Sequence, residues 1–114
     1  MPSGNIAILT LTVKAGGALA ANRFVTQAGA YPAAGAKAFG CTRTKADAAG
    51  DLVPCDVQGT TVAEAGAAIT ADQTVQVDAQ GRVVPFSTGA AVGRAMEAAG
   101  AAGAFIEILL VPTA

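Results

Sequence analysis

Short hydrophobic segments separated by glycine and proline make up most of the sequence, and this pattern predicts β-strands. The clearest alternation of apolar and polar residues is Thr74–Asp78. The turn Ala79–Gly81 follows it and leads into Arg82–Phe86, which is typical of a β-hairpin. The other predicted strands are Ile6–Val13, Asn22–Ala28, Ala36–Thr44, Asp51–Val57, Ala90–Ala95 and Phe105–Val111.

Two further features qualify this β pattern. Thr61 and Glu64 have the spacing of a capping box before Ala65–Ile69, and Met96–Ala104 is rich in alanine. Glycines interrupt both segments, so at most one short helix is predicted. Pro54 predicts that the strand around it lies at a sheet edge or contains a bulge. The chain is therefore predicted to be mainly β.

The sequence also indicates two similar β units. Residues 40–57 can be placed over residues 93–110, an offset of 53, and apolar residues then coincide near the ends of both segments. Upstream, with one residue of slippage, Val25 matches Val77. Alanine is abundant in both halves and inflates such matches, so an unrepeated chain stays open as the alternative. In either case the predicted fold is a small β-barrel or β-sandwich of short antiparallel strands.

A single β-rich domain over residues 1–114 is predicted, because this length is at the lower end of the usual domain size. Within it, residues 1–14 form either an arm or the first strand. No apolar run reaches the roughly 18–20 residues that span a bilayer, so no membrane partner is expected. The apolar run Ile6–Val13 has no Lys or Arg before it, unlike a signal peptide, so synthesis in the cytosol is expected.

The composition predicts a thin hydrophobic core. Hydrophobic residues make up 53% of the chain, but 29 of them are alanine. A small domain with so few large apolar side chains gains further burial by forming oligomers. The net charge is only −1, which gives no electrostatic case for nucleic acid or an anionic membrane as a partner.

The sequence lacks the residues that most catalytic sites need. It contains no histidine, the commonest general base and metal ligand. Gly35–Gly40 has the spacing of a P-loop, but Cys41 and Thr42 stand where Lys and Ser or Thr are required. Without a base, neither Cys41 nor Cys55 fits a nucleophile. We therefore predict no enzymatic activity, cofactor or metal centre, with a cation site formed by two acidic loops as the open alternative.

The two cysteines are predicted to be close together. If the strands on either side of Lys45–Gly50 pair as an antiparallel hairpin, Cys41 faces Pro54. A shift of one residue, or a bulge at Pro54, places Cys41 opposite Cys55. We expect neighbouring thiols that are reduced in the cytosol and able to form a disulfide after release.

Much of the chain resembles the small capsid cement, or head decoration, proteins of tailed bacteriophages. The resemblance lies in Ala67–Pro85, Ala91–Ala98 and Ala101–Leu110. In that family a strand, an Asp-x-x-Gly type turn, a Val-Gly-x-Ala strand and a closing hydrophobic strand follow in this order. The opening strand Ile6–Val13 also looks similar, whereas Tyr31–Val57 matches only loosely.

The resemblance implies a non-enzymatic structural protein of the virion. Such a protein is made in the host bacterial cytoplasm, binds the outer surface of an icosahedral phage capsid and cements the shell between capsomers. Its partners would be the major capsid protein and further copies of itself, commonly as a trimer. The N-terminal segment is poor in polar residues and suits the addition of a strand to a partner. The candidate capsid or oligomer contacts are Ile6, Ile8, Leu9 and Leu11.

Two other classes of function stay open from the sequence. One is a secreted or cell-surface β-rich module for adhesion or binding. The other is a binder of a small molecule or a metal ion. Neither has a motif in this chain that would identify its ligand.

Overall fold

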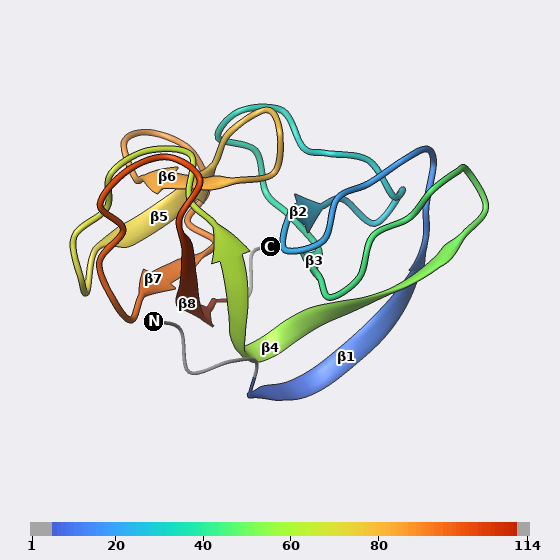
Figure 1. The fold of residues 1–114 in the computed structure, drawn as a ribbon, viewed down its shortest axis with the longest axis horizontal. Helices are drawn as coiled ribbons and strands as arrows, with labels where there is room; N and C mark the ends of the chain where they lie inside the picture. The colour runs from blue at the N-terminus through green and yellow to red at the C-terminus, as the bar shows by residue number, and fades with distance from the viewer. Residues whose placement is uncertain (1–5, 112–114) are drawn as a thin grey trace.

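The computed structural model describes residues 6–111, which fold into β-strands joined by turns and loops (Figure 1). Within this range the chain contains no helix, so the two segments that also fitted a helix are not helical. The eight strands are β1 (Ala7–Lys14), β2 (Phe24–Val25), β3 (Gly40–Thr42), β4 (Leu52–Glu64), β5 (Thr74–Val77), β6 (Val83–Pro85), β7 (Gly93–Ala95) and β8 (Phe105–Leu110).

Seven strands form a nearly closed, barrel-like antiparallel sheet in the order β2-β3-β4-β8-β7-β5-β6. Its two ends are linked, because the backbone N–H of Phe24 in β2 donates to the carbonyl of Gly81 in the β5–β6 turn at 2.7 Å. β1 lies outside this path and pairs only with β4. The structure confirms the predicted mainly β fold class.

β4 is the strand on which the whole sheet is built. Its first part, up to Gly59 at the bend, pairs with β1, and residues 60–64 pair with β8. Gly59 separates the two parts with a φ of 95°, and a side chain there would collide with the backbone of Ile6. Figure 1 shows the resulting bend in the middle of β4. Thr61 and Glu64 extend this strand instead of capping a helix. Both residues pair with β8, and the backbone N–H of Glu64 donates to the carbonyl of Asn22.

The two similar β units indicated by the sequence are present. Residues 10–25 correspond to residues 60–75, an offset of 50, and residues 40–57 correspond to residues 93–110, an offset of 53. We call residues 10–57 the first repeat and residues 60–110 the second repeat.

The strand registers carry this correspondence. The pair Val13↔Val53 between β1 and β4 recurs as Ala63↔Ile106 between β4 and β8. The bridge between Leu19 and Ala46 likewise recurs between Ile69 and Ala99. The sequence match of Val25 with Val77 is wrong, however. Val25 faces Gly40 and Val75 faces Gly93, so Val75 is the true counterpart of Val25. The offset changes from 50 to 53 because the second repeat has three extra residues between these two pairs of segments.

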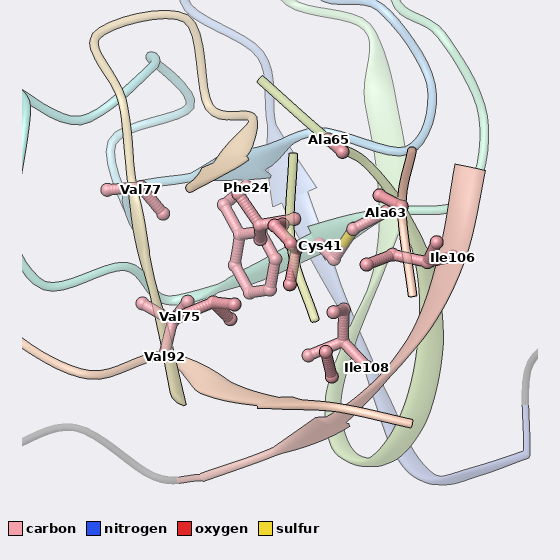
Figure 2. Close-up of a cluster of buried hydrophobic side chains, with 13 residues drawn as sticks. Phe24, Cys41, Ala63, Ala65, Val75, Val77, Val92, Ile106 and Ile108 are labelled. Atoms are coloured by element: carbon pink, nitrogen blue, oxygen red, sulfur yellow. The ribbon is translucent and has the colours of Figure 1, made fainter. Parts of the chain in front are cut away.

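Each repeat supplies its own hydrophobic core. The buried cluster of the first repeat contains Val13, Ala15, Leu19, Val25, Ala46, Val53 and Cys55. Their counterparts all belong to the larger cluster: Ala63, Ala65, Ile69, Val75, Ala99, Ile106 and Ile108. This larger cluster also contains Phe24 and Cys41 from the first repeat (Figure 2). The outer face of β2 and β3 therefore packs against the second repeat.

The predicted hairpin between β3 and β4 is confirmed, but its register is not the predicted one. Cys41 faces Asp56, and Cys55 faces Thr42. The cause is the connection, which is longer than the six residues assumed: pairing stops at Thr42, and Ala46 bonds to Leu19 instead. Because neighbouring positions along a strand point to opposite faces, the two cysteines lie in different core clusters. Both are free thiols, and a disulfide would require one side chain to cross the sheet.

Pro54 also departs from expectation, because it lies inside β4 with β1 on one side and β3 on the other. The ladder tolerates it for a local reason. Position 54 faces Arg43, the first residue after β3, and the N–H of Arg43 donates to the carbonyl of Pro54 at 3.0 Å. The absence of an N–H in proline therefore removes only the return bond at the end of the ladder.

Candidate interaction surface

β1 presents an unpaired edge. It runs along β4 at the outside of the molecule (Figure 1), and no strand within residues 6–111 pairs with its other side. The backbone N–H of Ala15 donates to the carbonyl of Asp51 at 2.8 Å, which makes Lys14↔Leu52 a non-hydrogen-bonded pair. The backbone groups of Lys14, and by alternation of Thr12, therefore point away from β4.

Four exposed hydrophobic side chains lie on or just before β1. Ile6 and Ile8 expose 66% and 80% of their surface, and Leu9 and Leu11 each expose 40%. Val13 is the buried hydrophobic residue of the strand. A long hydrophobic edge strand is a site of strand addition or aggregation unless a partner covers it. The four contact residues proposed from the sequence thus lie together on or just before β1, available to a partner.

An apolar groove adjoins β1 where the two repeats meet. Its volume is about 240 Å³, and Leu11 of β1 forms part of its wall. Two pairs of equivalent positions from the two repeats also line it, Phe39 with Val92 and Val57 with Leu110. The rest of the wall is Phe24, Ala38, Gly40, Gln58 and Val111. A cavity of roughly 150 Å³ already holds benzene. The groove therefore has room for a large apolar side chain.

A second groove of about 350 Å³ lies on the outer face of β5, β7 and β8. It is lined by Thr74, Ala91, Gly93, Arg94, Leu109 and Val111. Leu109 and Val111 are exposed there. Sequence reasoning missed this surface, because it identified Phe105–Val111 only as a closing hydrophobic strand and did not say which of its side chains are exposed.

A buried carboxylate fixes β1 to the rest of the sheet. Asp56 of β4 is fully buried and accepts hydrogen bonds from three side chains. Arg43 Nε lies 2.7 Å from Asp56 Oδ1, Thr10 Oγ1 of β1 lies 3.1 Å from the same oxygen, and Thr61 Oγ1 lies 2.9 Å from Oδ2. Charge and hydrogen bonds together compensate for the burial of this group. The result is a rigid base for the exposed strand.

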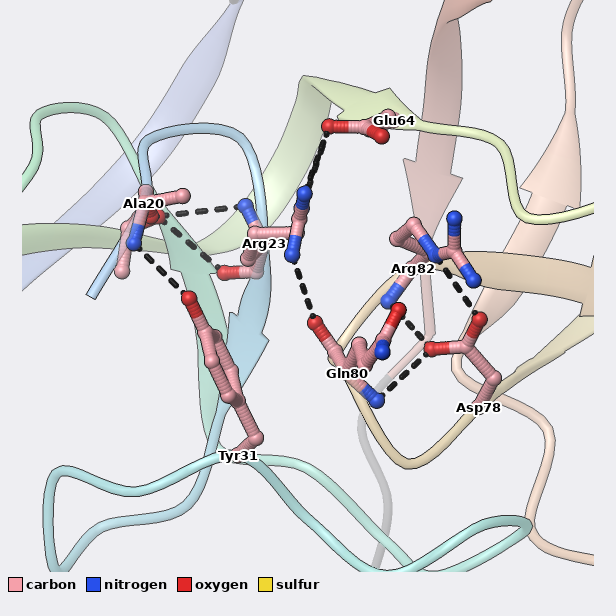
Figure 3. Close-up of polar contacts among 8 residues, drawn as sticks. Ala20, Arg23, Tyr31, Glu64, Asp78, Gln80 and Arg82 are labelled. Carbon is pink, nitrogen blue, oxygen red and sulfur yellow. Dashed lines mark hydrogen bonds and ion pairs between the residues drawn. The ribbon is translucent and has the colours of Figure 1, made fainter. Parts of the chain in front are cut away.

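A second polar cluster holds the two repeats together (Figure 3). Arg23 of the first repeat donates from Nε and Nη2 to Glu64 Oε1 at 3.1 and 2.9 Å, and from Nη1 to the carbonyl of Gln80. Its guanidinium lies 5.9 Å from the ring centroid of Tyr31, and Tyr31 Oη accepts from the N–H of Ala20. Arg23 therefore connects the two repeats through its side chain.

The two cysteines of the described residues are buried thiols. Within residues 6–111, no group of three His, Cys, Asp or Glu side chains could hold a metal ion. No helix in the same range could cross a membrane. Burial raises the pKa of Cys41 to about 12 and that of Cys55 to about 11. Both thiols therefore stay protonated at neutral pH, which makes them poor nucleophiles.

Comparison with known proteins identifies one similar solved structure and one matching family. No curated protein matches the chain. Among solved structures, the head fiber gp8.5 N base in bacteriophage phi29 is similar with a TM-score of 0.72 and 19% identity. The similarity covers 90% of this chain and 93% of that chain, and it shows a shared fold. A family model described as phage cement protein matches residues 2–110. The chain therefore belongs to the phage cement protein family.

Proposed function

We propose that this protein binds the outer surface of an icosahedral phage capsid and stabilises the shell between neighbouring capsomers. Membership of the phage cement family makes it a structural component of the phage head. The cementing role is inferred from the family, and this role requires the major capsid protein as the partner. The protein is made in the host cytoplasm and acts without enzymatic turnover.

The exposed hydrophobic strand β1 is the observation that carries this proposal. Its edge offers backbone donors and acceptors, and Ile8 and Leu9 offer apolar contact area. An extended segment that joins a sheet edge gains affinity from main-chain hydrogen bonds and specificity from alternate side chains. We assign Ile6, Ile8 and Leu9 to the capsid contact. We assign Leu11, which lies further along the strand, to the contact with a neighbouring copy.

We further propose that the protein acts as a homo-oligomer, a trimer on the capsid. The thin core and the exposed apolar surface favour association. Several weak capsid contacts held by one oligomer act together, so avidity replaces a single tight contact. Sedimentation analysis of the free protein and particle counting on decorated capsids measure the number of copies. A monomer in both states contradicts this part of the proposal.

The experiment is binding to capsids that lack their decoration. Purified protein is sedimented with such capsids, and capsid disruption by heat is followed with and without it. Ile8→Asp places a charge on a side chain that is exposed in the free protein, so it leaves folding intact and weakens binding at least about tenfold. Phe86→Asp is the matched control, an exposed hydrophobic residue beside β6. Equal binding by both variants, or no binding by the wild type, contradicts the proposal.

A further inference from the structure

The first repeat covers a strand edge of the second repeat through one residue. Asn22 accepts a hydrogen bond from the N–H of Glu64 at its carbonyl, and its Nδ2 donates to the carbonyl of Val62, both at 3.0 Å. Asn22 reaches this edge from a left-handed backbone conformation with a φ of 63°. Arg23 beside it pairs with the Glu64 side chain. The edge of residues 60–64 is thereby covered within one chain.

The equivalent edge of the first repeat is not covered within the described residues. By the offset of 50, Val62 and Glu64 correspond to Thr12 and Lys14 of β1. The backbone groups of these two residues point away from β4, as shown above. β1 thus offers the same edge, in the same orientation, without its cover.

The second repeat carries the equivalent of the covering residue. Asp72 corresponds to Asn22 and has a φ of 69°, and these are the two non-glycine residues with positive φ within residues 6–111. The N–H of Asp72 donates to Ala95 at 2.8 Å, as the N–H of Asn22 donates to Thr42 at 2.9 Å. Asp72 is therefore held in the covering conformation, yet its carbonyl accepts no hydrogen bond from any described residue.

The charges at the two uncovered elements are complementary. Lys14 stands where the covered edge has Glu64, and Asp72 stands where the covering loop has Asn22. Asp72 exposes 84% of its side chain, and its ion pair with Arg94, at 3.2 Å, lies in solvent and is weak. A carboxylate cannot donate as the amide of Asn22 does, but it accepts from the ammonium group of a lysine.

The surface next to Asn22 is buried within the chain, whereas the corresponding surface next to Asp72 is exposed. Next to Asn22, Phe24 and Cys41 are buried against the second repeat. Their counterparts, Thr74 and Arg94, are exposed and line the groove that contains Leu109. The second repeat therefore has an open apolar face beside Asp72, and β1 has an open apolar edge beside Lys14.

We propose that the second repeat of one copy covers β1 of another copy, in a head-to-tail contact that repeats the one inside the chain. Lys14 donates its N–H to the carbonyl of Asp72 of the partner subunit, and its ammonium group pairs with that carboxylate. Such a contact is heterologous and closes into a ring when its rotation permits. This deepens the proposed function, because it rests on the oligomer and names the surfaces that form it.

The test places the residues of the internal contact at the corresponding positions of the proposed interface. Lys14→Glu alone sets two carboxylates against each other, its own and that of Asp72 of the partner subunit. We expect the dissociation constant of the oligomer to rise at least about tenfold. Adding Asp72→Asn and Gln73→Arg rebuilds the residue set of Glu64, Asn22 and Arg23 across the interface. The triple variant should associate within about threefold of the wild type. The double variant Asp72→Asn with Gln73→Arg keeps Lys14, which lacks the carboxylate of Glu64. Its association should stay weak.

Sedimentation velocity over a concentration series gives these constants, with melting temperatures as a check on folding. Lys45→Glu is the matched control, because its pair with Asp47 lies in an exposed loop of the first repeat. A triple variant no tighter than Lys14→Glu, or a wild type that is monomeric both free and on capsids, overturns the proposal.

Amide hydrogen exchange tests the edge directly. The N–H groups of Thr12 and Lys14 should exchange rapidly in dilute protein and become protected as it associates. Val13, whose N–H points toward Val53, should be protected throughout. Unchanged exchange at Thr12 and Lys14 in the associated protein refutes the contact. Capsid binding is scored separately, so loss of capsid affinity in an associating protein contradicts the proposed function and leaves this contact standing.

Discussion

At the residue scale, the polar groups buried in this sheet are few and each has a defined set of partners. No buried side-chain nitrogen or oxygen within residues 6–111 lacks a hydrogen bond. Asp56 is the clearest case, because it is a carboxylate at full burial in a chain with a thin core. The sequence did not reveal this role, since an aspartate near Pro54 is equally expected in a turn.

Replacing Asp56 by alanine should destabilise the fold by about 2–3 kcal/mol, because Arg43, Thr10 and Thr61 lose their common acceptor. Urea unfolding measures the change. Asp47→Ala, at an exposed ion pair, should cost less than about 0.5 kcal/mol. A similar cost at both positions would show that Asp56 contributes nothing specific.

The two buried thiols predict a loss of stability in alkaline solution. Burial raises the pKa of Cys41 from 9.0 to about 12 and that of Cys55 to about 11, with the nearby Asp56 acting in the same direction. The folded state therefore holds these protons more tightly than the unfolded chain. Their contribution to stability is complete below pH 9.0 and is lost as the pH rises toward 11–12. Urea midpoints between pH 8 and pH 10.5 should fall more steeply for the wild type than for Cys41→Ala, and equal slopes would refute this.

At the element scale, the sequence predicted where strands occur but not how far they run. The hairpin of β5 and β6 was readable because its turn contains glycine between two β-rich segments. β4 was not, because Gly59 at its bend looks like the end of a strand, and Thr61 and Glu64 beyond it look like the start of a helix. Only the pairing with β8, a partner distant in sequence, decides between these readings. The register at Cys41 failed similarly, since the bridge of Ala46 to Leu19 is a long-range contact.

Gly59 should tolerate a side chain much less well than Gly50 does. Gly59→Ala meets both an unfavourable φ and the backbone of Ile6, whereas Gly50→Ala has a similar φ of 94° and open space around it. We expect about 1–2 kcal/mol for Gly50→Ala and at least about 1 kcal/mol more for Gly59→Ala. Chemical denaturation of the two variants gives the comparison. Equal costs would mean that the bend of β4 tolerates a side chain.

At the scale of the whole molecule, the duplication was visible in the sequence only where its offset is constant. Residues 40–57 and 93–110 aligned correctly, but the change of offset upstream hid the equivalence of Val25 and Val75. The interaction surface was harder to find. Ile8 and Leu9 read as an ordinary strand, and the exposure of that strand follows from its position beside β4, which no local pattern encodes.

The two repeats should fold as one unit, because the second core depends on the first repeat. Phe24→Ala should cost about 3–4 kcal/mol, since its ring fills the cluster of the second repeat. The control is Thr74, the exposed counterpart of Phe24 in the second repeat. Thr74→Ala should change stability by less than about 0.5 kcal/mol. Thermal and chemical unfolding measure both. A small effect of Phe24→Ala would indicate two independent cores.

The passage of β4 through both repeats has a mechanical consequence. In the proposed role, a shell filled with compressed DNA pulls the proteins on its surface apart along the plane of the capsid. When tension runs along β4, β1 resists at one end and β8 at the other, and each ladder is loaded in shear. Hydrogen bonds in shear must break together, whereas those of a hairpin pulled from its open end break one at a time. A single continuous strand thus lets a domain with a thin core transmit force without opening its middle.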